Sequence, residues 1–217
     1  MGEKILGVIF DLDGVIVSTD NCHYLAWKRM ADEEGIPFDR KVNERLRGVS
    51  RMESLAIILE RASRAYTQEE KLALAERKNG YYVQLIGQLT QNDILPGALD
   101  TLRLLKEQNV KVAIGSSSRN TPIILRQIGL SDAFDAIADG NAIRNSKPDP
   151  EVFLLAARLL GLAPANCLVV EDADAGVQAA LTGGMRALGV GSAAANPTAT
   201  FHAQSLQTAD FASILNA

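Results

Sequence analysis

The most continuous apolar pattern in the chain lies near its start. Five of the six residues at positions 5–10 are apolar, and they do not alternate with polar residues. A short run of this kind is typical of a strand that is buried on both faces, as in a parallel sheet. We therefore predict a central strand here, and the residues that follow it become candidates for a site at its carboxyl end.

Between residues 17 and 110 the pattern changes, and no strand candidate occurs. Apolar residues near a 3.6-residue period predict a first helix, with Thr19 or Asp20 as its cap. Further along, Thr67 followed by Glu70 is the pattern of a capping box at a helix start. The stretch as a whole predicts helices at residues 19–35, 40–46, 51–65 and 68–90.

From residue 96 onward, helical patterns alternate with short apolar runs. This alternation is typical of a parallel sheet with right-handed crossovers. The predicted strands lie at residues 110–115, 136–138, 167–170 and 187–190. The predicted helices lie at residues 96–108, 121–128, 149–160 and 174–182, with a last short helix near residues 210–215.

The order of these elements predicts an α/β fold with an insertion. We expect a Rossmann-like, doubly wound parallel sheet core formed by residues 1–17 and 92–217. An all-helical cap domain, residues 18–91, would leave the core directly after the first strand and return through a second short linker. Such a connection permits a helical unit to act as a lid.

Composition narrows the classes of partner. The 217 residues carry 47% hydrophobic and 22% charged side chains with a net charge of −4, so neither nucleic acid nor an anionic membrane is an expected partner. No apolar run approaches the ~20 residues that span a bilayer, because Arg158 interrupts the longest one. Glu3 and Lys4 precede the first strand without a signal-peptide pattern. With only Cys22 and Cys167 and no metal or disulfide spacing, a cytoplasmic location is expected.

Acidic residues follow two of the predicted strands. Asp11 and Asp13 come directly after the first strand, and Glu171 and Asp172 follow the strand at residues 167–170. Two carboxylates this close repel each other unless a cation or a shared proton compensates them. For the first pair, an acidic turn without a chemical role is an equally good explanation, because Asp-Gly is a common turn pair.

Two further clusters have both a chemical and a structural interpretation. The serines at 116–118, followed by Arg119 and Asn120, suit a phosphate at a helix start, but an ordinary capped turn has the same composition. Lys147 is a candidate phosphate contact, although a surface lysine beside a capping Asp149 is also common. Parallel topology brings all these clusters to one edge of the sheet, which favours the chemical interpretation.

Together these residues predict phosphoryl transfer. Asp11 and Asp172 offer the hard oxygen ligands that Mg²⁺ prefers. A carboxylate nucleophile, Asp11, would form an aspartyl-phosphate, and Asp13 would protonate the leaving oxygen and later deprotonate the incoming one. Ser116 and Lys147 would hold the remaining phosphoryl oxygens.

The same residues carry a family resemblance. Asp11-Leu12-Asp13-Gly14-Val15, Ser116, Lys147-Pro148 and Glu171-Asp172, in this order, resemble the four motifs of the haloacid dehalogenase superfamily of phosphotransferases. The helical insertion resembles that superfamily's smaller cap type. A finer resemblance, to the sugar-phosphate mutases of the superfamily, rests on His23 with Trp27 and on residues 47–51, 77–79 and 116–120.

The resemblance implies a role for each matching position. It implies Mg²⁺ held by Asp11, the carbonyl of Asp13 and Asp172, with Glu171 close by. It implies that Arg51 binds the distal phosphate of a sugar-phosphate substrate. Further implied phosphate contacts are Ser116, Ser117, Ser118, Asn120 and Lys147. The implied sugar contacts are His23, Trp27, Gly48, Val49, Ser54 and Lys78.

The implied reaction interconverts β-D-glucose 1-phosphate and glucose 6-phosphate in a monomeric enzyme. It proceeds through β-glucose 1,6-bisphosphate, which also serves as primer. A cap phosphate site in residues 47–51 favours a mutase over a sugar-phosphate phosphatase, which needs no second site. Trp27 on its spacing is equally well a core residue, and Lys78 lies in a helix rich in solvent-exposed charges. The departures from the family pattern are Ser18, Arg47, Arg119 and Asp174.

Two alternatives belong to other classes. A phospho-accepting receiver domain is also doubly wound and uses Asp, Mg²⁺ and Lys, but the order of the motifs and the long insertion argue against it. A catalytically inactive sugar-phosphate binding protein is disfavoured because Asp11 and Asp13 are both present.

Overall fold

The computed structural model describes residues 3–46 and 49–217. The chain divides into two compact units. One, the core unit, consists of Met1–Ser18 and Thr90–Ala217, and the other, the helical unit, of Thr19–Leu89. In the part of the chain that is described, no helix combines the length and the apolar character needed to cross a membrane.

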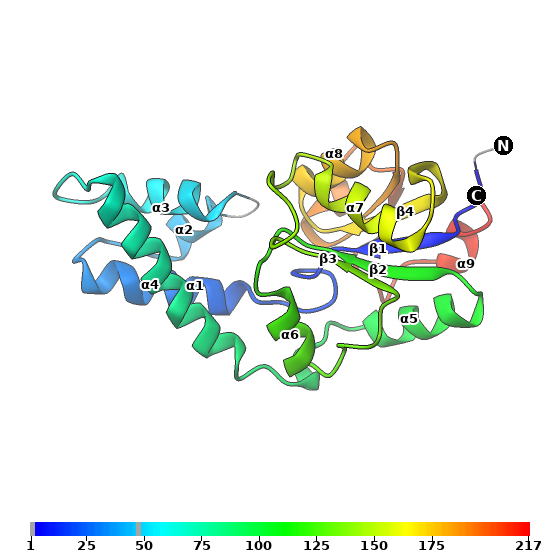
Figure 1. Ribbon diagram of the computed structural model, residues 1–217, viewed down its shortest axis with the longest axis horizontal. Helices are drawn as coiled ribbons and strands as arrows, with labels where there is room; N and C mark the ends of the chain where they lie inside the picture. The colour runs from blue at the N-terminus through cyan, green and yellow to red at the C-terminus, as the bar shows by residue number, and fades with distance from the viewer. Residues whose placement is uncertain (1–2, 47–48) are drawn as a thin grey trace. The chain divides into compact units, whose positions relative to one another are not determined.

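The core unit is built on a parallel sheet of six strands in the order β3-β2-β1-β4-β5-β6 (Figure 1). Phe10 at the end of β1 is paired with Ile114 in β2 and with Val170 in β4. The three central strands therefore end nearly level, and the residues that follow them meet at one edge. The strands are β1 Gly7–Phe10, β2 Lys111–Gly115, β3 Ala136–Ala138, β4 Cys167–Glu171, β5 Arg186–Gly189 and β6 Phe201–His202.

Helices cover both faces of this sheet. Figure 1 shows α7 and α8 on one face and α5 and α6 on the other. In α7, Phe153, Ala156, Ala157 and Leu160 are buried at helical spacing and pack on the sheet around Val169. The helices are α5 Ala98–Glu107, α6 Thr121–Gln127, α7 Glu151–Leu160, α8 Asp174–Thr182 and α9 Phe211–Ile214, with 3₁₀ turns η1 Gln91–Asp93, η2 Pro164–Asn166 and η3 Gly191–Ala195.

The helical unit has a separate apolar core. Met30, Leu55, Ile58 and Leu74 are buried together there, one or two from each long helix. It consists of α1 Asp20–Glu33, α2 Arg40–Glu44, α3 Arg51–Leu59 and α4 Gln68–Ile86. The predicted fold class, a doubly wound parallel sheet with an inserted helical unit, is thus confirmed.

Some predicted element boundaries are wrong. The third helix ends at Leu59, and the amides of Arg61 and Ala62 then donate to carbonyls three residues back instead of four, so the chain turns out of the α-helix. The next helix begins with the capping box of Thr67 and Glu70, as predicted. The side chain of Thr19 makes no capping bond at the start of α1, and its hydroxyl accepts from Tyr82 at 2.9 Å. Strand β6, only two residues long, is absent from the sequence prediction.

Candidate active site

The first acidic pair lies in a tight turn at the end of β1. The amide of Asp11 donates to the carbonyl of Val170 at 2.9 Å, which continues the strand pairing by one residue. Gly14 has a φ of 84°, a conformation that favours glycine, and its amide donates to Val17 at 2.8 Å. The turn thereby fixes Asp11 and Asp13 at the sheet edge, as the sequence predicts.

The second acidic pair lies beside the first. Carboxylate oxygens of Asp11, Glu171 and Asp172 all lie within 4.8 Å of one another. Glu171 is only 1% exposed and Asp11 only 7%. Oxygen atoms from three carboxylates are a donor set that suits Mg²⁺, so the residues present fit such an ion.

Lys147 is the cation of this cluster. Its ammonium lies 2.7 Å from Oε2 of Glu171 and also bonds to the carboxylate of Asp11. The ring of Phe153 lies beneath it, with Nζ 4.6 Å from the ring centroid. Lys147 therefore reaches the sheet edge predicted for it, although its approach, residues 145–150, forms no regular helix or strand until α7 begins at Glu151.

Burial and like charge perturb these groups. Burial, together with the charge of Asp11, raises the pKa of Glu171 to about 7. Burial and the charges of Asp11, Glu171 and Asp13 raise the pKa of Asp172 to about 8. Burial alone lowers the pKa of Lys147, but the two carboxylates that it contacts outweigh burial and raise it. The negative charge of the cluster exceeds what one lysine neutralises, which is the situation that a divalent cation relieves.

Two glycines make room for the acids. A Cβ at Gly14 would lie 2.2 Å from Oδ2 of Asp172, and a Cβ at Gly176 would lie 1.9 Å from Oε2 of Glu171. Sequence reasoning did not identify Gly176 or Phe153 as site residues. A signal for Gly176 is its place inside helix α8, where glycine costs stability and usually marks close packing.

The serine cluster follows β2 at the same edge. Ser116 is 3% exposed, and its Oγ accepts from the amide of Ser118 at 3.2 Å. The hydroxyl of Ser118 in turn accepts from the amide of Asn120 at 3.2 Å. The Oγ of Ser117 is buried and has no hydrogen-bond partner among the described residues. A buried hydroxyl of this kind calls for an explanation such as a ligand, and an anion is one that fits.

Three of the predicted sugar contacts, His23, Trp27 and Lys78, lie together in the helical unit. Lys78 is 3% exposed and lies 2.9 Å from Nδ1 of His23, with its ammonium over the rings of Trp27 and Tyr82. It is therefore not the solvent-exposed charge that its helix pattern favours. Trp27 belongs to the apolar core of the unit.

The remaining cap residues lie on α3 or before it. Arg51 donates to Asn79 at 2.9 Å and begins α3, in which Ser54 is buried. Val49 is 38% exposed. Arg47 and Gly48 lie outside the described residues.

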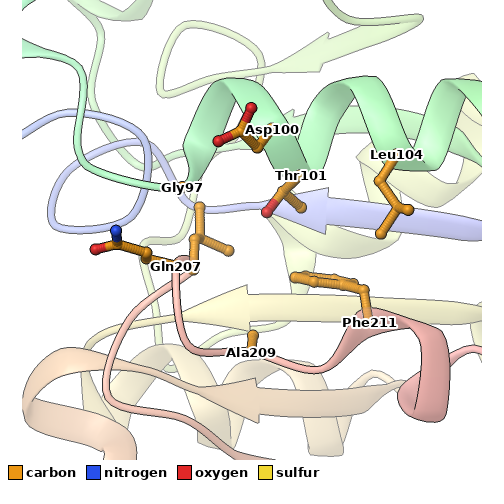
Figure 2. Close-up of a pocket in the computed structure, with 8 residues that line it drawn as sticks. Gly97, Asp100, Thr101, Leu104, Gln207, Ala209 and Phe211 are labelled. Carbon is orange, nitrogen blue, oxygen red and sulfur yellow. The ribbon is translucent and has the colours of Figure 1, made fainter.

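A hollow elsewhere in the core unit contains none of the predicted residues. It measures about 260 Å³ and lies between α5 and the segment that leads to α9 (Figure 2). Its one carboxylate, Asp100, pairs with Arg103 at 2.6 Å. Phe211 and Leu104 supply apolar wall on the α9 and α5 sides. Without a cluster of reactive groups, this hollow is not the candidate active site.

In this parallel sheet a carboxylate turn follows β1, serines follow β2, and two acids lie at the end of β4, beside a lysine. This arrangement defines a phosphotransferase class. The family model for haloacid dehalogenase-like hydrolases matches residues 5–184, and the chain belongs to this family. This confirms the predicted resemblance.

Within this family, the chain is similar in sequence and in structure to several characterised proteins and solved structures. The chain is 50% identical to the β-phosphoglucomutase of Bacillus subtilis over 85% of this chain and 82% of that protein. A crystal structure of β-phosphoglucomutase from Clostridium difficile matches with 43% identity and a TM-score of 0.89, over 98% of this chain and 96% of that one. The phosphorylated carbohydrates phosphatase of Thermotoga maritima is 32% identical over 82% of this chain and 81% of that protein.

Proposed function

We propose that the protein is a β-phosphoglucomutase, an enzyme that interconverts β-D-glucose 1-phosphate and glucose 6-phosphate. The observation that carries this proposal is the cluster of Asp11, Lys147, Glu171 and Asp172 in a chain that is 50% identical to a β-phosphoglucomutase. The relative described as a phosphatase is less similar, at 32% identity.

In the proposed mechanism, Asp11 is the nucleophile. One of its carboxylate oxygens forms a bond to phosphorus while the bond from phosphorus to the sugar oxygen breaks. Asp13 donates a proton to that leaving oxygen and later removes one from the attacking hydroxyl. Lys147, already bonded to Asp11, offsets negative charge as the anionic phosphoryl group approaches.

Mg²⁺ is the proposed cofactor. Asp11, the carbonyl of Asp13, Glu171 and Asp172 would hold it, and when bound it supplies positive charge that screens the phosphoryl oxygens from the attacking carboxylate. The residues of the chain provide the remaining contacts. Ser116, Ser117, Ser118, Asn120 and Lys147 are the proposed phosphate contacts of the core unit.

The helical unit is proposed to recognise the rest of the substrate. A fixed guanidinium binds phosphate in a bidentate manner, so Arg51 is the proposed contact of the distal phosphate. Because Lys78 donates to Nδ1 of His23, the proton of the neutral ring lies on the opposite nitrogen. The proposed sugar contacts are His23, Trp27, Gly48, Val49, Ser54 and Lys78.

The proposed cycle needs a second phosphate site. Phosphorylated Asp11 transfers its phosphoryl group to the 6-hydroxyl of β-glucose 1-phosphate, which gives β-glucose 1,6-bisphosphate. This intermediate then returns its 1-phosphate to Asp11 and leaves as glucose 6-phosphate. Glucose 1,6-bisphosphate is therefore both intermediate and primer, and we propose that the enzyme acts as a monomer in the cytoplasm.

A sugar-phosphate phosphatase is the second candidate, favoured by the relative from Thermotoga maritima. One incubation separates the two functions. The protein is mixed with Mg²⁺, β-glucose 1-phosphate and a trace of bisphosphate primer, and glucose 6-phosphate is measured against inorganic phosphate. A mutase yields mainly glucose 6-phosphate, whereas mainly inorganic phosphate contradicts the proposal and supports the phosphatase.

A further inference from the structure

The loop that follows β3 holds the serine loop that follows β2. The amide of Gly140 donates to the carbonyl of Ser118 at 3.2 Å. The side-chain amide of Asn141 donates to the carbonyl of Arg119 at 3.0 Å. Two consecutive carbonyls of the proposed phosphate loop, residues 116–120, are thus bonded to residues 140 and 141.

Backbone packing reinforces these bonds. A Cβ at Gly140 would lie 2.3 Å from the carbonyl oxygen of Ser117, so glycine is required for this close approach. The carbonyls of Ser117, Ser118 and Arg119 therefore lie against the loop after β3, and these contacts fix the path of the serine loop.

Asn141 is itself oriented by its neighbour. Asp139 is 9% exposed, and its carboxylate accepts from the backbone amide of Asn141 at 2.8 Å and from its side-chain amide at 3.2 Å. The side chain of Asn141 is therefore shared between Asp139 and the carbonyl of Arg119. Although Asn141 lies near the surface, it joins the two loops.

We infer that Asn141 is a positioning residue, which holds the Arg119 carbonyl and thereby fixes the serine loop, residues 116–120, in the conformation that offers its hydroxyls to a phosphate. This inference rests on the proposed function, because that function makes the serine loop a phosphate site. Asn141 itself contacts the carbonyl of Arg119 and the carboxylate of Asp139. Its proposed effect on phosphate binding is therefore indirect, through the serine loop.

The test compares two asparagines that make the same kind of bond. Asn166 donates from its side chain to the carbonyl of Lys4 at 3.0 Å, before β4 and at the opposite end of the strands. We expect Asn141→Ala to raise the dissociation constant of inorganic phosphate, titrated with Mg²⁺ present, by about three- to tenfold, the loss of about one hydrogen bond. We expect Asn166→Ala to leave it unchanged, while both variants lower the melting temperature to a similar extent.

A second variant keeps the test informative if Asn141→Ala folds poorly. Asn141→Ser retains a short polar side chain for the local turn but is too short to hold the Arg119 carbonyl, so it should weaken phosphate binding in the same way. The inference is overturned if the Asn141 variants bind phosphate like the parent protein, or if Asn166→Ala weakens binding equally. Glucose 6-phosphate formation by the parent protein is measured separately, so failure of the mutase proposal is distinguishable from failure of this one.

Discussion

Nζ of Lys147 lies 2.7 Å from Oε2 of Glu171, and the two side chains are only 11% and 2% exposed. A buried ion pair of this kind is costly to desolvate, and it contributes little to stability compared with an apolar pair. Removing one partner is different, since it leaves a buried charge without compensation. The stability of the core unit should therefore depend on whether each charged group of the site keeps its partner.

Replacement of the lysine should reveal this dependence. We expect Lys147→Met to lower the free energy of unfolding by about 3–5 kcal/mol, because Asp11 and Glu171 lose their shared cation. Excess Mg²⁺ should restore part of the loss by neutralising the same carboxylates. Urea denaturation with and without Mg²⁺ measures both effects.

The control for this experiment is an exposed ion pair of the same unit. Arg103 pairs with Asp100 while both side chains are more than 70% exposed, at 71% and 77%, so Arg103→Met should change stability little, with no dependence on Mg²⁺. Equal losses in the two variants, or a loss in Lys147→Met that Mg²⁺ does not reduce, would contradict the proposed metal site.

Replacement of the nucleophile should abolish turnover without unfolding the protein. We expect Asp11→Asn to reduce formation of glucose 6-phosphate by about a thousandfold or more, because an amide oxygen does not form the acyl-phosphate. Mass spectrometry of acid-quenched protein should find a phosphoryl group on the peptide containing Asp11 in the parent only. Asp174→Asn is the control, since Asp174 is exposed and bonds to Asn196, and it should retain activity.

Much of the site follows from sequence because parallel strands end together. The apolar run before Asp11 and the one before Glu171 predict buried parallel strands, and the pairing of Phe10 with Val170 in the structure brings the acids side by side. The residues that sequence reasoning missed act through contacts between separate segments. Gly176 against Glu171 and Phe153 beneath Lys147 have no periodic signal that links them.

Errors in the helical unit have a similar cause. Lys78 occurs among other charged residues, so its helix pattern indicates an exposed position, yet contacts with three aromatic side chains of the unit bury it: His23, Trp27 and Tyr82. Beyond the end of α3 at Leu59, Tyr66 donates to Glu34, the residue that follows α1. Tertiary contacts of this kind override local pattern.

His23 should make stability depend on pH. Burial, with the nearby charges of Lys78 and Arg51, lowers its pKa well below 6.5. Since the folded-state pKa is below the unfolded value, neutral His23 contributes stability above about pH 6.5, and this contribution is lost as the pH falls. Urea denaturation at pH 7.5, 6.5 and 5.5 should show a smaller decline in stability for His23→Gln than for the parent.

The chain's other histidine provides the control for that experiment. His202 is exposed in β6, so His202→Gln should decline with pH like the parent. If His23→Gln and the parent lose the same free energy of unfolding between pH 7.5 and 5.5, the neutral, buried state assigned to His23 is wrong.

Arg51 should separate the mutase from simple phosphate-ester hydrolysis. We expect Arg51→Ala to lower conversion of β-glucose 1-phosphate by about a hundredfold, because two charge-assisted hydrogen bonds to the distal phosphate are lost. Hydrolysis of p-nitrophenyl phosphate, which has no distal phosphate, should change less than about threefold, since the ester needs only the core residues. Arg45→Ala removes an exposed arginine of the same unit that pairs with Glu60 at 2.8 Å, and it should alter neither rate. Equal losses of both activities in Arg51→Ala would contradict a distal phosphate site at this residue and would favour the phosphatase.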